Sequence, residues 1–280
     1  MGRVTAVIPA AGMGTRLWPL TYAIPKEMLP LGPKPAIQLV VEELIAGGVK
    51  DFVIVIGKKK EAIAEHFMAL RATEPLFGDD DVTVRFAYQP QPRGLGDAVL
   101  CAEGLVEGDF LVALGDAVIG GQAFGDLAKR MLRVKAETGA AATLAVQQVA
   151  PADTSRYGIL DPGEAGPEGS VRILDLVEKP GPEHAPSNLA ICARYVLPPA
   201  VFGLLRELPA GVGGEVQLTD ALHLLVRHEL AYGVPLRPEE ERWDVGSALG
   251  YGHASLKAWL AHPEYGSELS EIARQTQRGV

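Results

Sequence analysis

The sequence has few cysteines, no excess of positive charge and no long apolar run. Its two cysteines, Cys101 and Cys192, lie in the apolar runs AVLCA and LAICA, which favours buried thiols in a reducing cytoplasm over a disulfide or a metal site. The formal net charge of −9 argues against a nucleic-acid surface, so an anionic ligand would need a few locally placed cations. Apolar stretches of about 18 residues, the length of a membrane span, do not occur, and the amino terminus does not resemble a secretory signal. We therefore expect a cytoplasmic protein without a membrane span.

Near its start the sequence does have a turn that is suited to phosphate. The apolar run Val4–Pro9 predicts a buried strand, and the residues AAGMG at 10–14 predict the turn after it. Small residues in such a turn let backbone N–H groups approach an anion closely. Two common phosphate loops are excluded, because Leu17 stands where the dinucleotide fingerprint needs a third glycine and no Gly-Lys-Ser/Thr follows. The nearby cations Arg16 and Lys26 favour an anion-binding role over an ordinary turn.

Strand and helix patterns alternate through the first half of the chain. Short, β-branched apolar runs predict strands at Asp51–Ile56, Val82–Tyr88 and Asp109–Leu114. Apolar residues at three- and four-residue spacing predict helices at Ala36–Ala46, Lys59–Leu70 and Leu95–Leu105. This alternation predicts an α/β fold with a Rossmann-like, mostly parallel mixed sheet flanked by helices. Ligands of such sheets bind beyond the carboxyl ends of the strands.

The second half is more mixed and predicts a smaller β-rich subdomain. The elements predicted there are strands at Ala140–Val149, Val171–Val177 and Leu189–Val196, a hairpin loop at Gly163–Gly169 and a helix at Glu215–His228. No linker clearly divides the chain, so we predict a single domain over residues 1–280. Its parts would be about 1–139, about 140–262 and a C-terminal tail at 263–280.

Charged and glycine-rich residues follow each of five apolar runs. They are Gly12, Gly14, Thr15, Arg16 and Lys26 after the first run, Gln89 and Gly94 after Val82–Tyr88, Asp116 after Asp109–Leu114, Glu178 and Lys179 after Val171–Val177, and Asp244 near the end. If these runs end at one edge of the sheet, two phosphate-friendly loops, two Asp and three cations converge there. Such a set suits phosphoryl or nucleotidyl transfer, in which Mg²⁺ bridges carboxylates and phosphate oxygens.

Each member of this set also has a plainer explanation. Arg16 could form a surface ion pair, and Asp116 could cap a helix. The pair at 178–179 could be a solvated strand end, and the lysine run at 58–60 is most simply a solvated helix start. The occurrence of chemically related groups at five strand ends favours the joint interpretation.

Four segments resemble the signatures of the sugar-1-phosphate nucleotidylyltransferases: GMGTRLWPLTYAIPKEMLPL, GLGDAVLCA, VEKPGPEHAPSNLAICARYVL and GGEVQLTDAL. The resemblance runs from about Val4 to Trp259, and its longer match is to the bacterial UTP–glucose-1-phosphate uridylyltransferases of that family. It implies that glucose 1-phosphate attacks the α-phosphorus of UTP to form UDP-glucose and pyrophosphate. It also implies Mg²⁺ as the cofactor and a homo-oligomer, either a dimer or a tetramer.

The same resemblance implies roles for individual residues. The nucleotide would be bound by Ala11, Gly12, Gly14, Thr15, Glu27, Gln89 and Gly94. The sugar phosphate would be bound by Gly158, Glu178, Lys179 and Asn188. The catalytic cations would be Arg16, Lys26 and Lys179, and the metal would be bound by Asp116 and Asp244.

Other functions stay open at this point. Asp97 stands where uridylyltransferases usually have His, and LGDAVIG is closer to the thymidylyltransferases, so dTTP is an alternative to UTP. A non-catalytic nucleotide-binding module is a second alternative, although the Asp and the cations are all present. An NAD-dependent oxidoreductase would need an acidic residue after the second predicted strand, where Gly57 and Lys58 stand.

Overall fold

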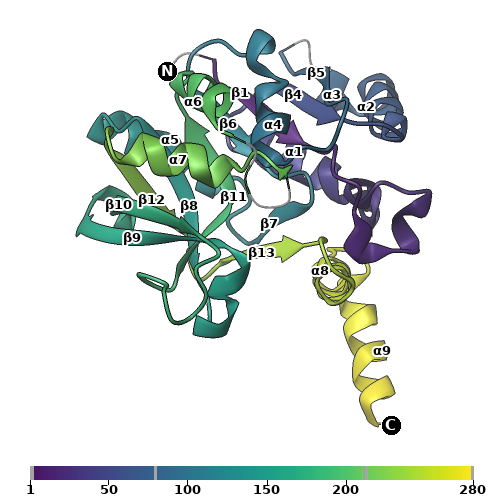
Figure 1. The fold of residues 1–280 in the computed structure, drawn as a ribbon. Coiled ribbons are helices and arrows are strands. Elements are labelled where there is room, and N and C mark those ends of the chain that lie inside the picture. The colour runs from purple at the N-terminus through teal and green to yellow at the C-terminus, as the bar shows by residue number, and fades with distance from the viewer. Residues whose placement is uncertain (1–2, 79–80, 210, 212–213, 279–280) are drawn as a thin grey trace.

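A nine-stranded mixed sheet forms the centre of the molecule (Figure 1). The structure, a computed structural model, describes residues 3–78, 81–209, 211 and 214–278. One half of the sheet is parallel, and its strands stand in the order β5 (Thr83–Tyr88), β4 (Asp51–Ile56), β1 (Thr5–Pro9) and β6 (Phe110–Ala113). Because these strands are parallel, their carboxyl ends lie at one edge of the sheet.

The other half of the sheet is mostly antiparallel and curls back on itself. Its strands follow β6 in the order β11 (Leu189–Leu197), β8 (Ala142–Gln148), β12 (Ala231–Pro235), β10 (Val171–Glu178) and β9 (Gly158–Ala165). At the carboxyl end of β6, Ala113 pairs with Arg194 of β11, and Ala190 lies farther along β11 in the same direction. Ile159 of β9 pairs with Ala190. The curl therefore brings the start of β9 beyond the carboxyl end of β6.

Helices cover both faces of the sheet. Alternate residues of a strand point to opposite faces, so Ala6 and Ile8 of β1 belong to one buried cluster and Val7 to the other. The first cluster includes side chains of α1 (Ala36–Ala46), α2 (Glu61–Thr73), α3 (Pro75–Gly78) and α5 (Asp126–Thr138). The second includes side chains of α4 (Leu95–Leu100), α6 (Ala200–Glu207) and α7 (Leu218–Val226). This is the covered sheet that the strand–helix alternation predicts.

Two short ribbons and two helices complete the described chain. Strand β7 (Ala117–Gly121) pairs with β13 (Glu240–Asp244), and β2 (Pro30–Leu31) pairs with β3 (Lys34–Pro35). Both ribbons lie outside the nine-stranded sheet. Helices α8 (Ala248–Leu260) and α9 (Gly266–Arg278) follow, and α9 carries the C-terminal end away from the body of the molecule (Figure 1). Among the described residues, no helix is both long enough and apolar enough to cross a bilayer.

Most predicted elements are present, with corrections at their ends. The bounds predicted for β4 and α1 match, whereas the helix predicted over Leu95–Leu105 ends at Leu100 and a short 3₁₀ turn containing Gly104 follows. The helix predicted over Glu215–His228 is α7, which begins three residues later and ends at Val226. The loop predicted at Gly163–Gly169 is wrong in its first part, because β9 continues to Ala165 and the hairpin turns at Glu168 and Gly169, both with positive φ. The predicted tail at 263–280 contains α9, and residues 279–280 lie outside the described chain.

Candidate active site

The turn after β1 is shaped by glycine and lies against Lys26. Gly14 has φ +66°, a conformation that L side chains rarely adopt. The Thr21 hydroxyl donates a hydrogen bond to the Gly14 carbonyl at 2.8 Å and so fixes the turn. A Cβ placed on Gly12 would lie 3.9 Å from the Lys26 amine. The backbone of this turn and the Lys26 ammonium therefore border the same space.

Lys26 belongs to a chain of four buried or half-buried charges. Its amine forms ion pairs with Asp116 and, at 3.9 Å, with Glu27, and the other Glu27 oxygen accepts from Lys60 at 2.7 Å. Burial lowers the pKa of Lys26, but Asp116 and Glu27 outweigh it and the pKa lies above its ordinary value. Burial raises the pKa of Asp116, but Lys26 outweighs it and the pKa lies below its ordinary value. Lys26 and Asp116 are thus held in their charged forms.

Lys60 corrects one sequence-based interpretation. The lysine run at 58–60 is most simply a solvated helix start by its pattern, and Lys58 and Lys59 are indeed exposed. Lys60 is buried, however, and its amine is turned inward onto Glu27. Burial raises the pKa of Glu27 although Lys60 and Lys26 both oppose this effect. The three lysines are identical in sequence, so the pattern could not show that one of them is buried.

One hollow of about 450 Å³ collects most of the residues expected on the nucleotide side. The expected residues that line it are Ala11, Gly12, Gly14, Thr15, Arg16, Lys26, Glu27, Gln89, Gly94 and Asp116. It opens at the carboxyl ends of β1 and β6, with Pro9 and Leu114 in its wall. Cations, a carboxylate and a glycine turn therefore share one cavity, as expected for a site that binds a polyphosphate.

Asp116 and Asp244 meet through the β7–β13 ribbon. Asp244 ends β13 opposite Ala117, and the Val245 amide donates to the Asp116 carbonyl at 2.9 Å. The expectation that Asp244 ends a strand at the edge of the main sheet is therefore wrong, because among the described strands β13 pairs with β7 alone. A Cβ placed on Gly246 would lie 2.8 Å from Asp244 Oδ1 and 3.0 Å from Arg16 Nη2, so Arg16 lies close to this carboxylate. The ribbon brings together both proposed metal ligands and one proposed catalytic cation.

The second glycine entry is packed tightly and holds Gln89. Gly94 has φ +104°, and a Cβ there would lie 2.6 Å from the Val216 carbonyl, which excludes a side chain. The Val216 carbonyl accepts from the Gly96 amide at 2.8 Å. The Gln89 amide Nε2 donates to the Gly94 carbonyl at 3.2 Å and to Asp97 at 2.7 Å. Gln89 is therefore buried and oriented before any ligand is bound.

The residues expected on the sugar side lie on the β9–β10 hairpin. Gly158 pairs with Glu178, and a Cβ on Gly158 would lie 3.3 Å from Glu178 Oε2. The Lys179 amine pairs with Glu178 at 2.8 Å, and the Lys179 amide donates to the Tyr157 carbonyl at 3.0 Å. Lys179 has φ +47°, which turns the chain at the strand end. The structure thus brings Gly158, Glu178 and Lys179 together.

Asn188 is placed differently. Its backbone carbonyl accepts from Val149, while its neighbour Ser187 donates to the Leu160 carbonyl at 2.6 Å. None of the contacts described for the chain joins Asn188 to Glu178 or Lys179. The segment of Asn188 is therefore held by β9 and by the residue after β8, and these contacts do not include Glu178 or Lys179.

Arg242 and Tyr157 join the two groups of residues, and the sequence-based reasoning missed both. The Arg242 guanidinium forms an ion pair with Asp244 and lies 5.2 Å from the ring centroid of Tyr157, which precedes Gly158. Arg242 Nε is buried without a hydrogen-bond partner among the described residues. Arg242 lies two residues before Asp244 on β13 and so on the same face of that strand, but this relation becomes visible only once the strand is known.

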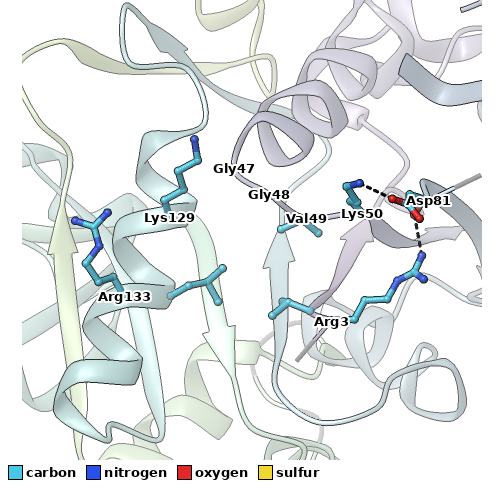
Figure 2. Close-up of a pocket in the computed structure, with 10 residues that line it drawn as sticks. Arg3, Gly47, Gly48, Val49, Lys50, Asp81, Lys129 and Arg133 are labelled. Atoms are coloured by element: carbon cyan, nitrogen blue, oxygen red, sulfur yellow. Dashed lines mark hydrogen bonds and ion pairs between the residues drawn. The ribbon is translucent and has the colours of Figure 1, made fainter. Parts of the chain in front are cut away.

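A larger hollow, of about 670 Å³, lies elsewhere and is not the candidate site (Figure 2). It is lined by Val4 and by the residues at 47–50 that precede β4, so it lies at the amino ends of β1 and β4. Asp81 binds two of its cations, since its side chain pairs with Lys50 at 2.8 Å and its carbonyl accepts from Arg3 at 2.9 Å. Size alone therefore does not identify the site, whereas the placement of charges at the carboxyl edge does.

Comparison with known proteins agrees with this geometry. A UTP–glucose-1-phosphate uridylyltransferase of Bacillus subtilis is 40% identical over 94% of this chain and 92% of its own length. A UTP–glucose-1-phosphate uridylyltransferase of Streptococcus pyogenes is 40% identical over 98% of this chain and 96% of its own. The solved structure of a UTP-bound UDP-glucose pyrophosphorylase of Acinetobacter baumannii superposes with a TM-score of 0.83, at 34% identity over 96% of this chain and 98% of that one. The nucleotidyl transferase family model matches residues 5–258, and the chain belongs to this family.

Proposed function

We propose that the protein is a UTP–glucose-1-phosphate uridylyltransferase, which converts UTP and glucose 1-phosphate into UDP-glucose and pyrophosphate. The observation that carries this proposal is the single cavity in which the glycine turn, Arg16, Lys26 and Asp116 meet. The uridylyltransferase names of relatives 40% identical over nearly the whole chain support it, and so does the UTP bound in the Acinetobacter structure.

In this reaction the protein needs no general base. The phosphate of a sugar 1-phosphate is already largely ionised near pH 7, so it can attack the α-phosphorus directly. The barrier comes from bringing one anion onto another, and catalysis must neutralise charge and place the two groups in line. Arg16 and Lys26 would hold the triphosphate and the leaving pyrophosphate, and Lys179 would hold the incoming phosphate. Glu178 would accept hydrogen bonds from the sugar hydroxyls, with Gly158 and Asn188 bordering that ring.

The nucleotide base would lie beside Gln89 and Gly94, with the backbone of Ala11, Gly12, Gly14 and Thr15 facing the phosphates. Glu27 acts in this proposal through Lys26 and Lys60, because both of its carboxylate oxygens already face these amines. The proposed division of the chain follows from this arrangement. Residues 1–139 would hold the nucleotide and residues 140–262 the sugar phosphate.

Asp116 and Asp244 would hold a divalent cation, which we propose is Mg²⁺. The two carboxylates supply hard oxygen ligands, and substrate phosphate oxygens and water would complete the coordination. Among the described residues, no group of three or more His, Cys, Asp or Glu forms a self-sufficient metal site, which fits an ion that arrives with its nucleotide. When bound, the ion supplies positive charge at the α-phosphate. Before it binds, Lys26 and Arg242 neutralise the two carboxylates.

A pyrophosphate-release assay over four substrate pairs tests the proposal. UTP and dTTP are each combined with glucose 1-phosphate and with galactose 1-phosphate, and kcat/KM is measured in the presence of Mg²⁺. We expect the highest kcat/KM for UTP with glucose 1-phosphate. An equal or higher value for dTTP would replace the uridylyl assignment by a thymidylyl one. Binding of UTP without any turnover would favour the non-catalytic module.

A further inference from the structure

Asp97 is a buried carboxylate that no proposed role yet explains. It lies in the first turn of α4, and each of its oxygens accepts one hydrogen bond. Oδ2 accepts from Gln89 Nε2 at 2.7 Å, and Oδ1 accepts from the exposed Arg93 at 2.8 Å. Asp97 does not line the candidate cavity, whereas Gln89 does. Of the two side chains that donate to Asp97, Gln89 is the one that lines the cavity.

The contacts of Gln89 leave its amide only one orientation. Its nitrogen faces two acceptors, the Asp97 carboxylate and the Gly94 carbonyl, and it donates one hydrogen to each. A rotation of the amide by 180° would bring Oε1 against these two oxygens and replace two attractions by two repulsions. Oε1 is consequently directed away from Asp97, and it accepts no hydrogen bond from any residue that the structure describes. Gln89 thus offers a ligand an acceptor and not a donor.

We propose that Asp97 is a positioning residue that fixes the Gln89 carbonyl as an acceptor and thereby selects nucleotides with an imide base. Uracil and thymine carry an N3–H that can donate to Oε1. Cytosine carries a lone pair at N3, which the same oxygen repels. Because thymine has the same N3–H, Asp97 acts against CTP and leaves the choice between UTP and dTTP to other contacts. This inference rests on the proposed function only in that a pyrimidine nucleotide occupies the cavity beside Gln89.

The variant that tests this is Asp97→Asn. An asparagine can offer either its oxygen or its nitrogen to Gln89, so the variant removes the closer of the two repulsions that oppose the rotated amide without a change of volume, and only the Gly94 carbonyl still opposes it. We expect the ratio of kcat/KM for UTP to that for CTP to fall at least about tenfold, since a site built to pair a polar group rejects an analogue that cannot pair it. The ratio for UTP to dTTP should not change. A parallel loss for all three nucleotides would overturn the proposal and leave Asp97 as a support for the loop entry.

Asp126→Asn is the matched control. Asp126, like Asp97, lies in the first turn of a helix and pairs with an arginine four residues away in the sequence, here Arg130. It also accepts from a second arginine, Arg237. It does not line the candidate cavity, so both nucleotide ratios should stay at their wild-type values. A fall of the UTP to CTP ratio in this variant would mean that any lost helix-start carboxylate relaxes selection, and would count against a specific role for Asp97.

Exchanging the amide of Gln89 and the carboxylate of Asp97 gives a second, independent test. Gln89→Glu alone places two carboxylates against each other and should abolish UTP selection. In the double variant Gln89→Glu with Asp97→Asn, the new asparagine amide can donate to one oxygen of the new carboxylate, while the other oxygen faces the base. We expect kcat/KM for UTP to recover at least about tenfold from the single variant. Absence of any recovery would contradict the proposed pairing.

Calorimetric binding separates this inference from the proposed function. UTP, dTTP and CTP are titrated into the wild-type protein with Mg²⁺ and without sugar phosphate. Selective binding of UTP and dTTP without turnover would remove the proposed reaction and keep the inference. CTP binding as tight as UTP binding would overturn the inference whichever reaction the protein performs.

Discussion

The nucleotide cavity and the β9–β10 hairpin hold their charges in opposite ways. At the cavity, the side chain of Glu27 is 1% exposed and pairs with Lys26, which also lines the cavity, and with Lys60 behind it, whose side chain is 6% exposed. On the hairpin, the side chains of Glu178 and Lys179 are 24% and 52% exposed and are paired only with each other in the described contacts. Buried charges are costly to leave unpaired, whereas an exposed pair contributes little by itself. One region is therefore preorganised by the fold, and the other is left for its ligand to order.

The difference follows from how the two regions are built. The cavity is lined by turns that follow strands of the parallel half of the sheet, and its side chains Glu27 and Gln89 are buried, whereas Arg16 is exposed. The hairpin ends at Lys179, whose φ of +47° and exposed side chain place it at the rim. In the proposed assignment, the fold therefore prepares the side that would bind the triphosphate, and the side that would bind the sugar phosphate is more adaptable.

The largest effect is expected at the carboxylates of Asp116 and Asp244, which the β7–β13 ribbon brings together. Asp116→Asn or Asp244→Asn should each lower kcat by about 10⁴-fold, since each removes a proposed metal ligand and leaves a cation unpaired. The measurement is kcat at saturating UTP, glucose 1-phosphate and Mg²⁺, with circular dichroism to verify the fold. Asp109→Asn, at the opposite end of β6 from Asp116, is the control and should keep normal turnover. Near-normal rates in both active-site variants would place the metal elsewhere.

Among the three changes predicted here, the largest loss of stability is expected at the buried Lys60. Lys60→Met leaves Glu27 buried without its closer partner, with Lys26 remaining at 3.9 Å, and should lower the free energy of unfolding by about 3 kcal/mol. Lys58→Met changes an exposed lysine of the same run and should stay within about 0.5 kcal/mol of the wild type. Urea unfolding of both variants gives the comparison. If Lys60→Met and Lys58→Met are equally stable, the charges of the cavity are not preorganised as described.

The smallest expected effect lies on the hairpin and is confined to one substrate. Lys179→Ala should cost on the order of 3 kcal/mol in kcat/KM for glucose 1-phosphate, the scale of one preorganised electrostatic contact. It should change the free energy of unfolding by less than about 1 kcal/mol, because the pair it breaks is exposed. UTP affinity, measured by calorimetry without the sugar, should be nearly unchanged. Loss of UTP affinity with intact glucose 1-phosphate kinetics would assign Lys179 to the triphosphate instead.

The sequence predicts the first elements of the fold better than the later ones. Strand β4 and helix α1 have the predicted bounds, because each is a continuous apolar pattern ended by turn residues. Helix α5 was missed although Leu127, Met131 and Val134 are spaced as a buried helical face. It is otherwise polar, and its Arg130 is buried by contacts with Glu240 and the Pro235 carbonyl, which come from distant sequence.

The candidate site was likewise predictable only in part from the sequence. The loops after β1 and β5 could be found because they follow apolar runs directly. The inward turn of Lys60, the stacking of Arg242 on Tyr157 and the bond between Asp97 and Gln89 could not, because each depends on a neighbour that only the fold supplies. Strand β13 was missed because EERWD is too polar to suggest a strand, and its one partner in the described part of the chain is the short strand β7.

The β7–β13 ribbon also sets when the enzyme becomes complete during its synthesis. The residues from Pro9 to Asp116 that line the nucleotide cavity are made before β13, and so before Asp244, which ends that strand. Since chains emerge with the amino end first, a nascent chain has most of the cavity lining, although not Glu215, before it has the second carboxylate. A chain that stops short of Asp244 lacks one proposed metal ligand, so we expect it to be inactive.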